Sequence, residues 1–289
     1  DTETIVHLYE DFGVECLNRL RGVFAFALWD KRRRRLLVAR DRLGVKPLFY
    51  AEGPQGIAFA SELRALRFLA PERVETDPQA VYDFFALRYI PGPGTFYRGV
   101  KKLLPGHFLD IMPEGAHLHQ YWDSAAIEEQ PGCAADYAEQ VLAKLRESVG
   151  LRLISDVPLG VFLSGGADSS AVVSLMAEHG HRPLRTFSVG FADPAFDERP
   201  YARQIAARYE TEHDEVTVEP KDILEHLPRL IELRDEPIAE PTDIPLYLLS
   251  RLAAQKVKVV LAGEGGDELF AGYPKYVAER WAAAAMPVM

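Results

Sequence analysis

The chain has 289 residues, of which 48% are hydrophobic and 26% are charged, and its formal net charge is −10. This length allows two domains with a core each, and the acidic balance argues against general affinity for nucleic acid or anionic membranes. No apolar run approaches membrane-spanning length, and no signal-peptide pattern opens the chain. Two cysteines, Cys16 and Cys133, cannot form a disulfide framework. We therefore expect a cytoplasmic protein without nucleic-acid or membrane partners.

The first half of the chain predicts an α+β domain. Short helices are expected around residues 4–20, followed by a β-hairpin in which a basic turn, Lys31–Arg35, joins strands at 23–29 and 36–39. A basic run can also mark a nucleic-acid patch, but the overall acidity favours a solvated turn. Later strands are expected at 57–60, 99–102 and 107–111. His117 and His119 share a strand face but lack a third partner, so surface positions are favoured over a zinc site.

Four stretches of this half resemble the later part of the glutaminase domain of glutamine-dependent asparagine synthetases, an N-terminal-nucleophile (Ntn) hydrolase: LRGVFAFALWD, ARDRLGVKPLFY, FASELRAL and KKLLPGHFL. In that family the first residue of the mature chain is a cysteine that attacks the glutamine amide. The resemblance puts that cysteine upstream of Asp1, implies that Asp1 holds the ammonium group of glutamine, and makes neither Cys16 nor Cys133 a nucleophile. We expect a fragment truncated at both ends, with 1–123 as the C-terminal part of a type 2 glutamine amidotransferase domain that does not hydrolyse glutamine by itself.

Residues 124–135, with acids, proline and glycine, predict a linker to a second domain. The helix expected at 138–153 has an inward face formed by Val141, Leu142, Leu145 and Val149. Strands are then expected at 157–163, 184–191, 215–218 and 257–261, alternating with helices near 168–179, 198–209, 222–234 and 243–255. Pro228 should break or kink the third of these helices. This order predicts a doubly wound parallel sheet with ligand sites at the carboxyl ends of its strands.

The stretch from Val157 to Gly180 organises this second domain. Its β-branched strand stops at Ser164-Gly165-Gly166, and an amphipathic helix then starts near Asp168 and ends before Gly180, a predicted C′ glycine. Glycines let the backbone approach a phosphate, the first helical N–H groups carry partial positive charge, and Ser169 and Ser170 add hydroxyl donors. A carboxylate beside a phosphate needs a cation between them, which predicts Mg²⁺ at Asp168. The alternative is a tight turn that needs glycine only for its geometry.

Two loops of this domain resemble motifs of known enzymes. The turn at 164–169 resembles the S-G-G-x-D-S pyrophosphate loop (PP-loop) of ATP pyrophosphatases, and the chain contains no G-x-x-x-x-G-K-[ST] P-loop. LAGEGGDELFAGY, ending at Tyr273, is close to the G-E-G-x-D-E-L-F-x-G-Y motif of asparagine synthetases, although a flexible polar loop is its alternative. The resemblance implies catalytic roles for Glu264, Asp267 and Asp168 and metal binding by Asp168 and Asp267. The expected ATP-binding residues are Leu163, Ser164, Gly165, Gly166, Asp168, Ser169, Ser170, Val189, Ala262 and Gly263.

By this resemblance, 136–289 is the N-terminal part of an asparagine synthetase (ATP pyrophosphatase) domain with an adenine nucleotide alpha hydrolase-like fold. We expect it to use ATP and Mg²⁺ to adenylate the side-chain carboxylate of aspartate. Ammonia derived from glutamine then displaces AMP, so the products are asparagine, AMP and pyrophosphate. The acceptor stays open, because RDEPIAEPTDIP, from Arg234 to Pro245, resembles a segment that borders the acceptor and varies in the family. The family's later lysine falls beyond Met289.

Three alternatives accompany this hypothesis. The first is a related amidotransferase or β-lactam-synthetase-like ligase that acts on another carboxylate. The second is a fragment that binds ATP without catalysis, and the third is an Ntn-type scaffold kept only for partner contacts. The expected partners are the small molecules ATP, aspartate and glutamine, and a homodimer is the one assembly that we consider.

Overall fold

The computed structural model describes residues 2–53, 56–69, 75–237 and 239–285. The chain forms two compact units: unit 1 comprises Asp1–Gln130 and Ile231–Ala239, and unit 2 comprises Pro131–Leu230 and Glu240–Met289. A short segment from the second half of the chain thus belongs to unit 1, a feature that the sequence-based division into 1–123, 124–135 and 136–289 lacks. That division stays a prediction. Within the described residues, no helix combines the length and the apolar character needed to cross a membrane.

Unit 1 contains two antiparallel sheets. The first has the order β1 (Ala25–Asp30), β2 (Arg35–Arg40), β6 (His107–Met112) and β7 (Gly115–Gln120), and the second has the order β4 (Gly56–Ala60), β3 (Phe49–Gly53) and β5 (Val100–Lys102). The predicted hairpin is confirmed, since Ala25 pairs with Arg40 and Asp30 with Arg35 on either side of the basic turn.

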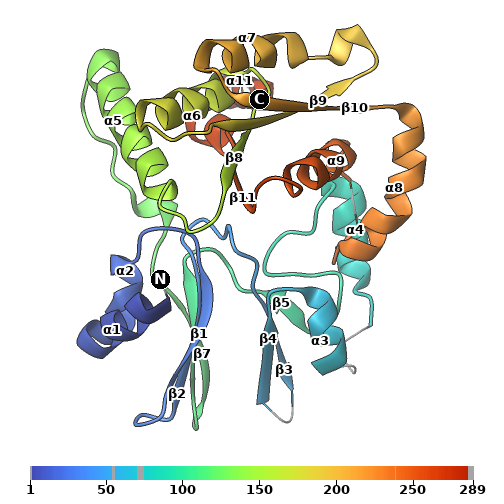
Figure 1. Ribbon diagram of the computed structural model, residues 1–289. Helices are drawn as coiled ribbons and strands as arrows, with labels where there is room; N and C mark the ends of the chain where they lie inside the picture. The colour runs from blue at the N-terminus through green and yellow to red at the C-terminus, as the bar shows by residue number, and fades with distance from the viewer. Residues whose placement is uncertain (1, 54–55, 70–74, 238, 286–289) are drawn as a thin grey trace. The chain divides into compact units, whose positions relative to one another are not determined.

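Helices cover the outer faces of both sheets, so that unit 1 has four layers in the order helix, sheet, sheet, helix (Figure 1). Its helical elements are α1 (Thr2–Phe12), η1 (Gly13–Glu15), α2 (Cys16–Arg19), α3 (Leu63–Leu69), α4 (Pro78–Leu87) and η3 (Ser124–Ala126). Leu17 of α2 packs on Leu37 of β2, whereas the next residue, Val38, points into the layer between the sheets. Leu63 and Leu66 of α3 are buried against the second sheet. The alternation of side chains along each strand thus builds both cores.

Unit 2 is built on a fully parallel sheet of order β10 (Glu212–Val218), β9 (Arg185–Phe191), β8 (Leu159–Phe162) and β11 (Val259–Leu261), as the sequence predicts. Helices α5 (Ala134–Arg152), α6 (Ala167–Glu178) and α7 (Arg199–Tyr209) lie on one side and α9 (Asp243–Ala253) on the other (Figure 1). Val161 packs towards α6 and α7, and Phe162 packs towards α9. The other elements are η4 (Pro194–Phe196), α8 (Pro220–Leu233), α10 (Gly266–Phe270) and α11 (Pro274–Ala285).

One expectation about the helices of unit 2 is wrong, and one of the two effects expected of Pro228 does not occur. Val149 is buried and Leu145 packs on the same core, but Val141 and Leu142 are 39% and 46% exposed, because that core reaches only the C-terminal half of α5. Helix α8 runs through Pro228 without a break, so of the two expected effects of this proline only the kink stays a prediction. Proline removes one backbone donor from the helix, and Leu230 beyond it is buried.

Candidate functional site

The turn after β8 keeps hydrogen-bond donors free. Ser164 Oγ accepts a hydrogen bond from Gly166 N at 3.2 Å and lies 3.0 Å from Ser169 Oγ. Gly166 is the N-cap residue of α6 and offers the first N–H groups of the helix no side-chain acceptor. Ser170 Oγ is buried and is the one such side-chain atom among the described residues without a hydrogen-bond partner. Because buried hydroxyls are normally paired, this turn has donors for an oxygen-rich ligand.

Gly165 and Gly166 differ in whether the fold would tolerate a side chain at their positions. Gly165 has φ +86°, and a Cβ there would lie 2.5 Å from Ala202 N and 2.6 Å from Tyr201 Cβ, both on α7. Gly165 is therefore required by geometry, as the alternative interpretation states. Gly166 has φ −69°, and its Cβ would meet only Ser164 Oγ, at 3.3 Å. Close approach of a ligand to the backbone is a reason for glycine at 166 that the fold itself does not supply.

The loop after β11 lies against the start of α6, because β8 and β11 are neighbours in the sheet. A Cβ on Gly263 would lie 2.9 Å from Ser169 N, and a Cβ on Gly266 would lie 2.5 Å from Asp168 Oδ2. Part of this stretch is the short helix α10, with Asp267 in its first turn, so it is not a flexible loop throughout. The Asp168 carboxylate thus touches the residue that precedes Asp267, whereas the Asp267 carboxylate lies beside Gly272.

Negative charge gathers around this second loop. Tyr273 donates a hydrogen bond to Glu268 Oε1 at 2.8 Å, and this bond, together with the charges of Glu268, Asp267 and Glu264, raises the pKa of the Tyr273 hydroxyl to about 12. Glu264 is exposed and Asp267 is half-buried. Lys275 Nζ, 4.7 Å from the centre of the Tyr273 ring, brings one positive charge close to this group. A group of acids at the carboxyl edge of a parallel sheet favours a cation there.

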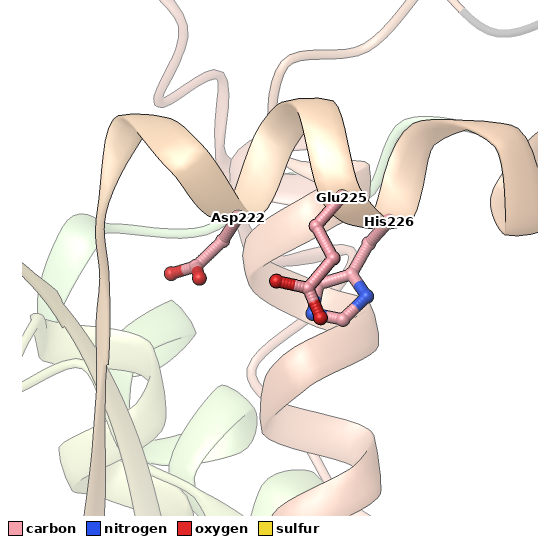
Figure 2. A group of neighbouring side chains, drawn as sticks. All are labelled: Asp222, Glu225 and His226. Carbon is pink, nitrogen blue, oxygen red and sulfur yellow. The ribbon is translucent and has the colours of Figure 1, made fainter.

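A separate group of potential metal ligands lies on α8. Asp222, Glu225 and His226 place their ligand atoms within 4.8 Å of one another, the one such group of three among the described residues (Figure 2). The Asp222 carboxylate already accepts a hydrogen bond from Glu219 N at 2.7 Å, and Glu225 is exposed. His226 is half-buried, and its ring centre lies 5.6 Å from that of Tyr247. Helix capping by Asp222 and packing by His226 therefore account for two members of this group without a metal ion.

The remaining expected ATP-binding residues line the same edge of the sheet. Leu163 N donates to Phe187 O at 2.9 Å and the Ser188 hydroxyl donates to Leu163 O, so the start of the turn is tied to β9. Val189 is partly buried and packs beside the Phe187 cluster on the α9 face. Ala262 follows β11 directly.

Neither of the two cysteines, Cys16 and Cys133, lies in a setting that would activate it as a nucleophile for glutamine hydrolysis. Asp1 lies outside the described residues. Both cysteines are free thiols, Cys16 buried and Cys133 exposed, and burial raises the pKa of the Cys16 thiol. A buried protonated thiol is a poor nucleophile. His117 and His119 are both exposed, which confirms the surface positions expected for them, and His119 stacks on Phe108 at a ring distance of 5.0 Å.

Two protein-family models match the chain. A glutamine amidotransferase domain matches residues 1–122, and asparagine synthase matches residues 140–288. The chain belongs to the asparagine synthase family. The turn after β8 and the loop after β11 both lie within the residues matched by asparagine synthase. Most of the four-layered unit 1 lies within the residues matched by the amidotransferase domain.

Individual relatives share nearly all of the chain. Asparagine synthetase [glutamine-hydrolyzing] 1 of Bacillus subtilis (strain 168) is 37% identical over 276 residues, which covers 96% of this chain and 43% of that protein. A putative asparagine synthetase [glutamine-hydrolyzing] of Mycobacterium tuberculosis (strain ATCC 25618 / H37Rv) is 40% identical over 285 residues, with the same coverage. Amidase chry2 of Gibberella zeae is 32% identical over 302 residues, covering 96% of this chain and 44% of that protein. The chain spans less than half the length of these relatives.

Proposed function

We propose that the chain is part of a glutamine-dependent asparagine synthetase, an ATP-dependent ligase that forms the side-chain amide of asparagine. The observation that carries the proposal is the turn after β8, where the buried Ser170 hydroxyl has no partner within the described residues and an acidic, glycine-rich loop lies alongside. Two relatives are named asparagine synthetases [glutamine-hydrolyzing], which supports asparagine as the product and glutamine as the amide donor, with aspartate as the acceptor in our proposal. The products are then asparagine, AMP and pyrophosphate.

The chemistry explains why such a turn is needed. A carboxylate is a poor acyl electrophile, and its attack on the α-phosphate of ATP converts it into an acyl-adenylate that ammonia can displace. The hydroxyls of Ser164, Ser169 and Ser170 and the backbone N–H groups of Gly165 and Gly166 would hold the departing pyrophosphate. Leu163, Val189, Ala262 and Gly263 would border the nucleoside.

The carboxylates fit a magnesium site by their chemistry. Asp168 is exposed and accepts no hydrogen bond from the described residues, so both of its oxygens are available. Asp168 and Asp267 would hold Mg²⁺, which neutralises charge on pyrophosphate when it is bound. Glu264, exposed on the same loop, would lie near the acceptor and carry protons as ammonia attacks.

Unit 1 would supply ammonia from glutamine in the complete protein, with Asp1 on the glutamine ammonium group. The free thiols Cys16 and Cys133 agree with a reducing, cytoplasmic location, which we retain as part of the proposal.

Calorimetry with ATP and Mg²⁺ on the 289-residue chain tests the nucleotide site. Asp168→Ala and Ser170→Ala should each weaken binding, the first at least about tenfold and the second about fivefold. Asp156→Ala is the matched control, because Asp156 is exposed and precedes the other end of β8. Equal affinity in all variants would reject the site.

The acceptor requires a protein extended to the length of the relatives. Pyrophosphate release with ATP, Mg²⁺ and glutamine should depend on aspartate. A relative at 32% identity, Amidase chry2, does not carry the asparagine synthetase name, so we keep as a second candidate a ligase that acts on a different carboxylate. A panel of carboxylates in ATP–pyrophosphate exchange distinguishes the two, since exchange with another acid and not with aspartate would replace the asparagine assignment.

A further inference from the structure

The segment Ile231–Ala239 comprises the last residues of α8 and the first part of the connection from α8 to α9, and yet it belongs to unit 1. The asparagine synthase match includes it, whereas the amidotransferase match ends at residue 122. A short acidic segment of the asparagine synthase match therefore belongs to the compact unit that contains the amidotransferase match. The contacts of this segment within unit 1 show how it is held.

Asp235 caps helix α3. Its Oδ2 accepts a hydrogen bond from Leu63 N at 2.6 Å and its Oδ1 accepts one from Arg64 N at 3.1 Å, at the first two positions of the helix. These N–H groups have no acceptor inside the helix, so a carboxylate from elsewhere is needed to pair them. The Leu63 side chain is 1% exposed and belongs to the core between α3 and the second sheet. The segment is thereby tied to a rigid part of unit 1.

Glu236 makes a second attachment beside the first. Its Oε1 accepts from Phe96 N at 3.2 Å, and its Oε2 lies 2.9 Å from Lys102 Nζ on β5. Both side chains of this ion pair are less than a quarter exposed, which limits screening by solvent. Lys102 Nζ also donates to Ile90 O at 2.8 Å. A third contact, from Arg88 Nη2 to Ala239 O at 2.8 Å, holds the end of the segment.

The opposite end of the connection is anchored in unit 2. Only Glu240, Pro241 and Thr242 separate the segment from α9, whose residues Ile244 and Leu249 are buried. The four Cα–Cα steps from Ala239 to Asp243 span at most about 14 Å, so a displacement of the segment that extends this tether pulls on the start of α9. Helix α9 packs directly on the face of β9 that carries Phe187 and Val189.

We propose that Asp235 and Glu236 are positioning residues that latch the α8–α9 connection onto unit 1, so that changes around α3 and residues 90–102 reach the start of α9. This latch would couple the amidotransferase and asparagine synthase regions of the chain. It does not depend on which carboxylate the ligase amidates, so it goes beyond the proposed function.

Hydrogen–deuterium exchange of the 289-residue chain, followed by mass spectrometry of its peptides, tests the latch. Asp235→Ala and Glu236→Gln should each speed exchange of peptides covering 231–239 by about fivefold, the effect of a lost helix cap. A smaller increase should extend over residues 243–247 at the start of α9. Glu240→Gln is the matched control, since Glu240 is an exposed acid of the same connection.

Two results would overturn the proposal. Faster exchange in α3 alone would make Asp235 a local helix cap, and unchanged exchange at the start of α9 would show that nothing is transmitted. If Asp235→Ala does not fold, Glu236→Gln and Lys102→Met decide, because their double variant should then increase exchange by less than the two single variants combined. The readout does not involve ATP or amide formation, so its failure leaves the proposed function untouched, and failure of ATP binding leaves the latch untouched.

Discussion

Two glycine-containing turns follow central strands of this protein, one after β2 and one after β8. Each contains an aspartate, and the two carboxylates differ in how many hydrogen bonds they accept. After β2, Asp41 is 1% exposed. Its two oxygens accept backbone hydrogen bonds from the N–H groups of Phe24, Leu43, Val45 and Lys46. After β8, Asp168 is exposed and accepts no hydrogen bond from the described residues. The oxygens of Asp41 are thus paired within the fold, whereas those of Asp168 are free to contact a ligand.

The difference teaches that an acid and a glycine at a strand end do not by themselves mark a site. What distinguishes the two turns is the number of donors and acceptors that the chain pairs internally. Arg40 reinforces the first turn by donating to the carbonyl oxygens of Lys46, Leu103 and Gly44. In the second turn, Ser170 Oγ stays unpaired. Hydrogen-bond accounting therefore assigns a structural role to Asp41 and leaves the Asp168 carboxylate open to the binding role that we propose for it.

The largest expected effect tests the structural turn. Asp41→Ala should lower the free energy of unfolding by about 3–5 kcal/mol, because it leaves buried backbone donors without an acceptor. Urea unfolding measures the loss. Glu114→Ala, in the exposed turn between β6 and β7, is the control and should change stability by less than about 0.5 kcal/mol. A loss below about 1 kcal/mol for Asp41→Ala would contradict the comparison.

The next effect concerns the glycine that packs against α7. Gly165→Ala should lower stability by about 2–3 kcal/mol, because φ is positive there and the new Cβ meets the backbone of Ala202. Gly166→Ala, which has neither problem, should lose less than about 1 kcal/mol. Thermal unfolding of both variants gives the comparison, and equal losses would show that the packing of the turn has been misjudged.

A third prediction concerns a carboxylate that, like Asp41, is paired internally. Glu215 receives two hydrogen bonds from Arg203, at 2.9 and 2.6 Å, and these, with His213, lower the pKa of its carboxyl group. A lowered pKa adds stability above the unfolded value of about 4.3, and this stability is lost as pH falls through the folded value. Glu215→Gln should therefore destabilise the chain by about 1 kcal/mol at pH 7, with allowance for solvent screening of a partly exposed pair. Urea unfolding from pH 7 down to pH 3 should show this difference shrinking, and a constant difference would refute it.

The smallest expected effect is on the stability of the binding turn. Asp168→Asn and Ser170→Ala should each change the free energy of unfolding by less than about 0.5 kcal/mol, since neither group has a partner within the described chain. The same denaturation assay measures both. A loss above about 1 kcal/mol for either would mean that the fold depends on the group and that its availability to a ligand has been overstated.

Local patterns explain how much of this molecule could be predicted. Strands β8 and β11 of unit 2 are short apolar runs, and the end of α6 follows from Gly180, which has φ +72°. Strand β10 begins with the polar residues 212–214, which no apolar pattern marks as a strand, so the sequence predicts only 215–218 there. Helix α4 was missed, although its start has a recognisable signal in Asp77, which caps the helix, followed by Pro78 at its first position. The attachment of Asp235 to α3 joins residues 172 positions apart, and no periodicity or spacing in the sequence announces a contact of that range.

The borrowed segment also has a consequence for synthesis on the ribosome. Domains generally fold as units while the chain emerges, and N-terminal ones fold first. Unit 1 departs from that order, because the carboxylates that pair with the α3 amides and with Lys102 are made only after most of unit 2 has been translated. Until residue 239 has emerged from the ribosome, unit 1 lacks its last segment and cannot complete these contacts.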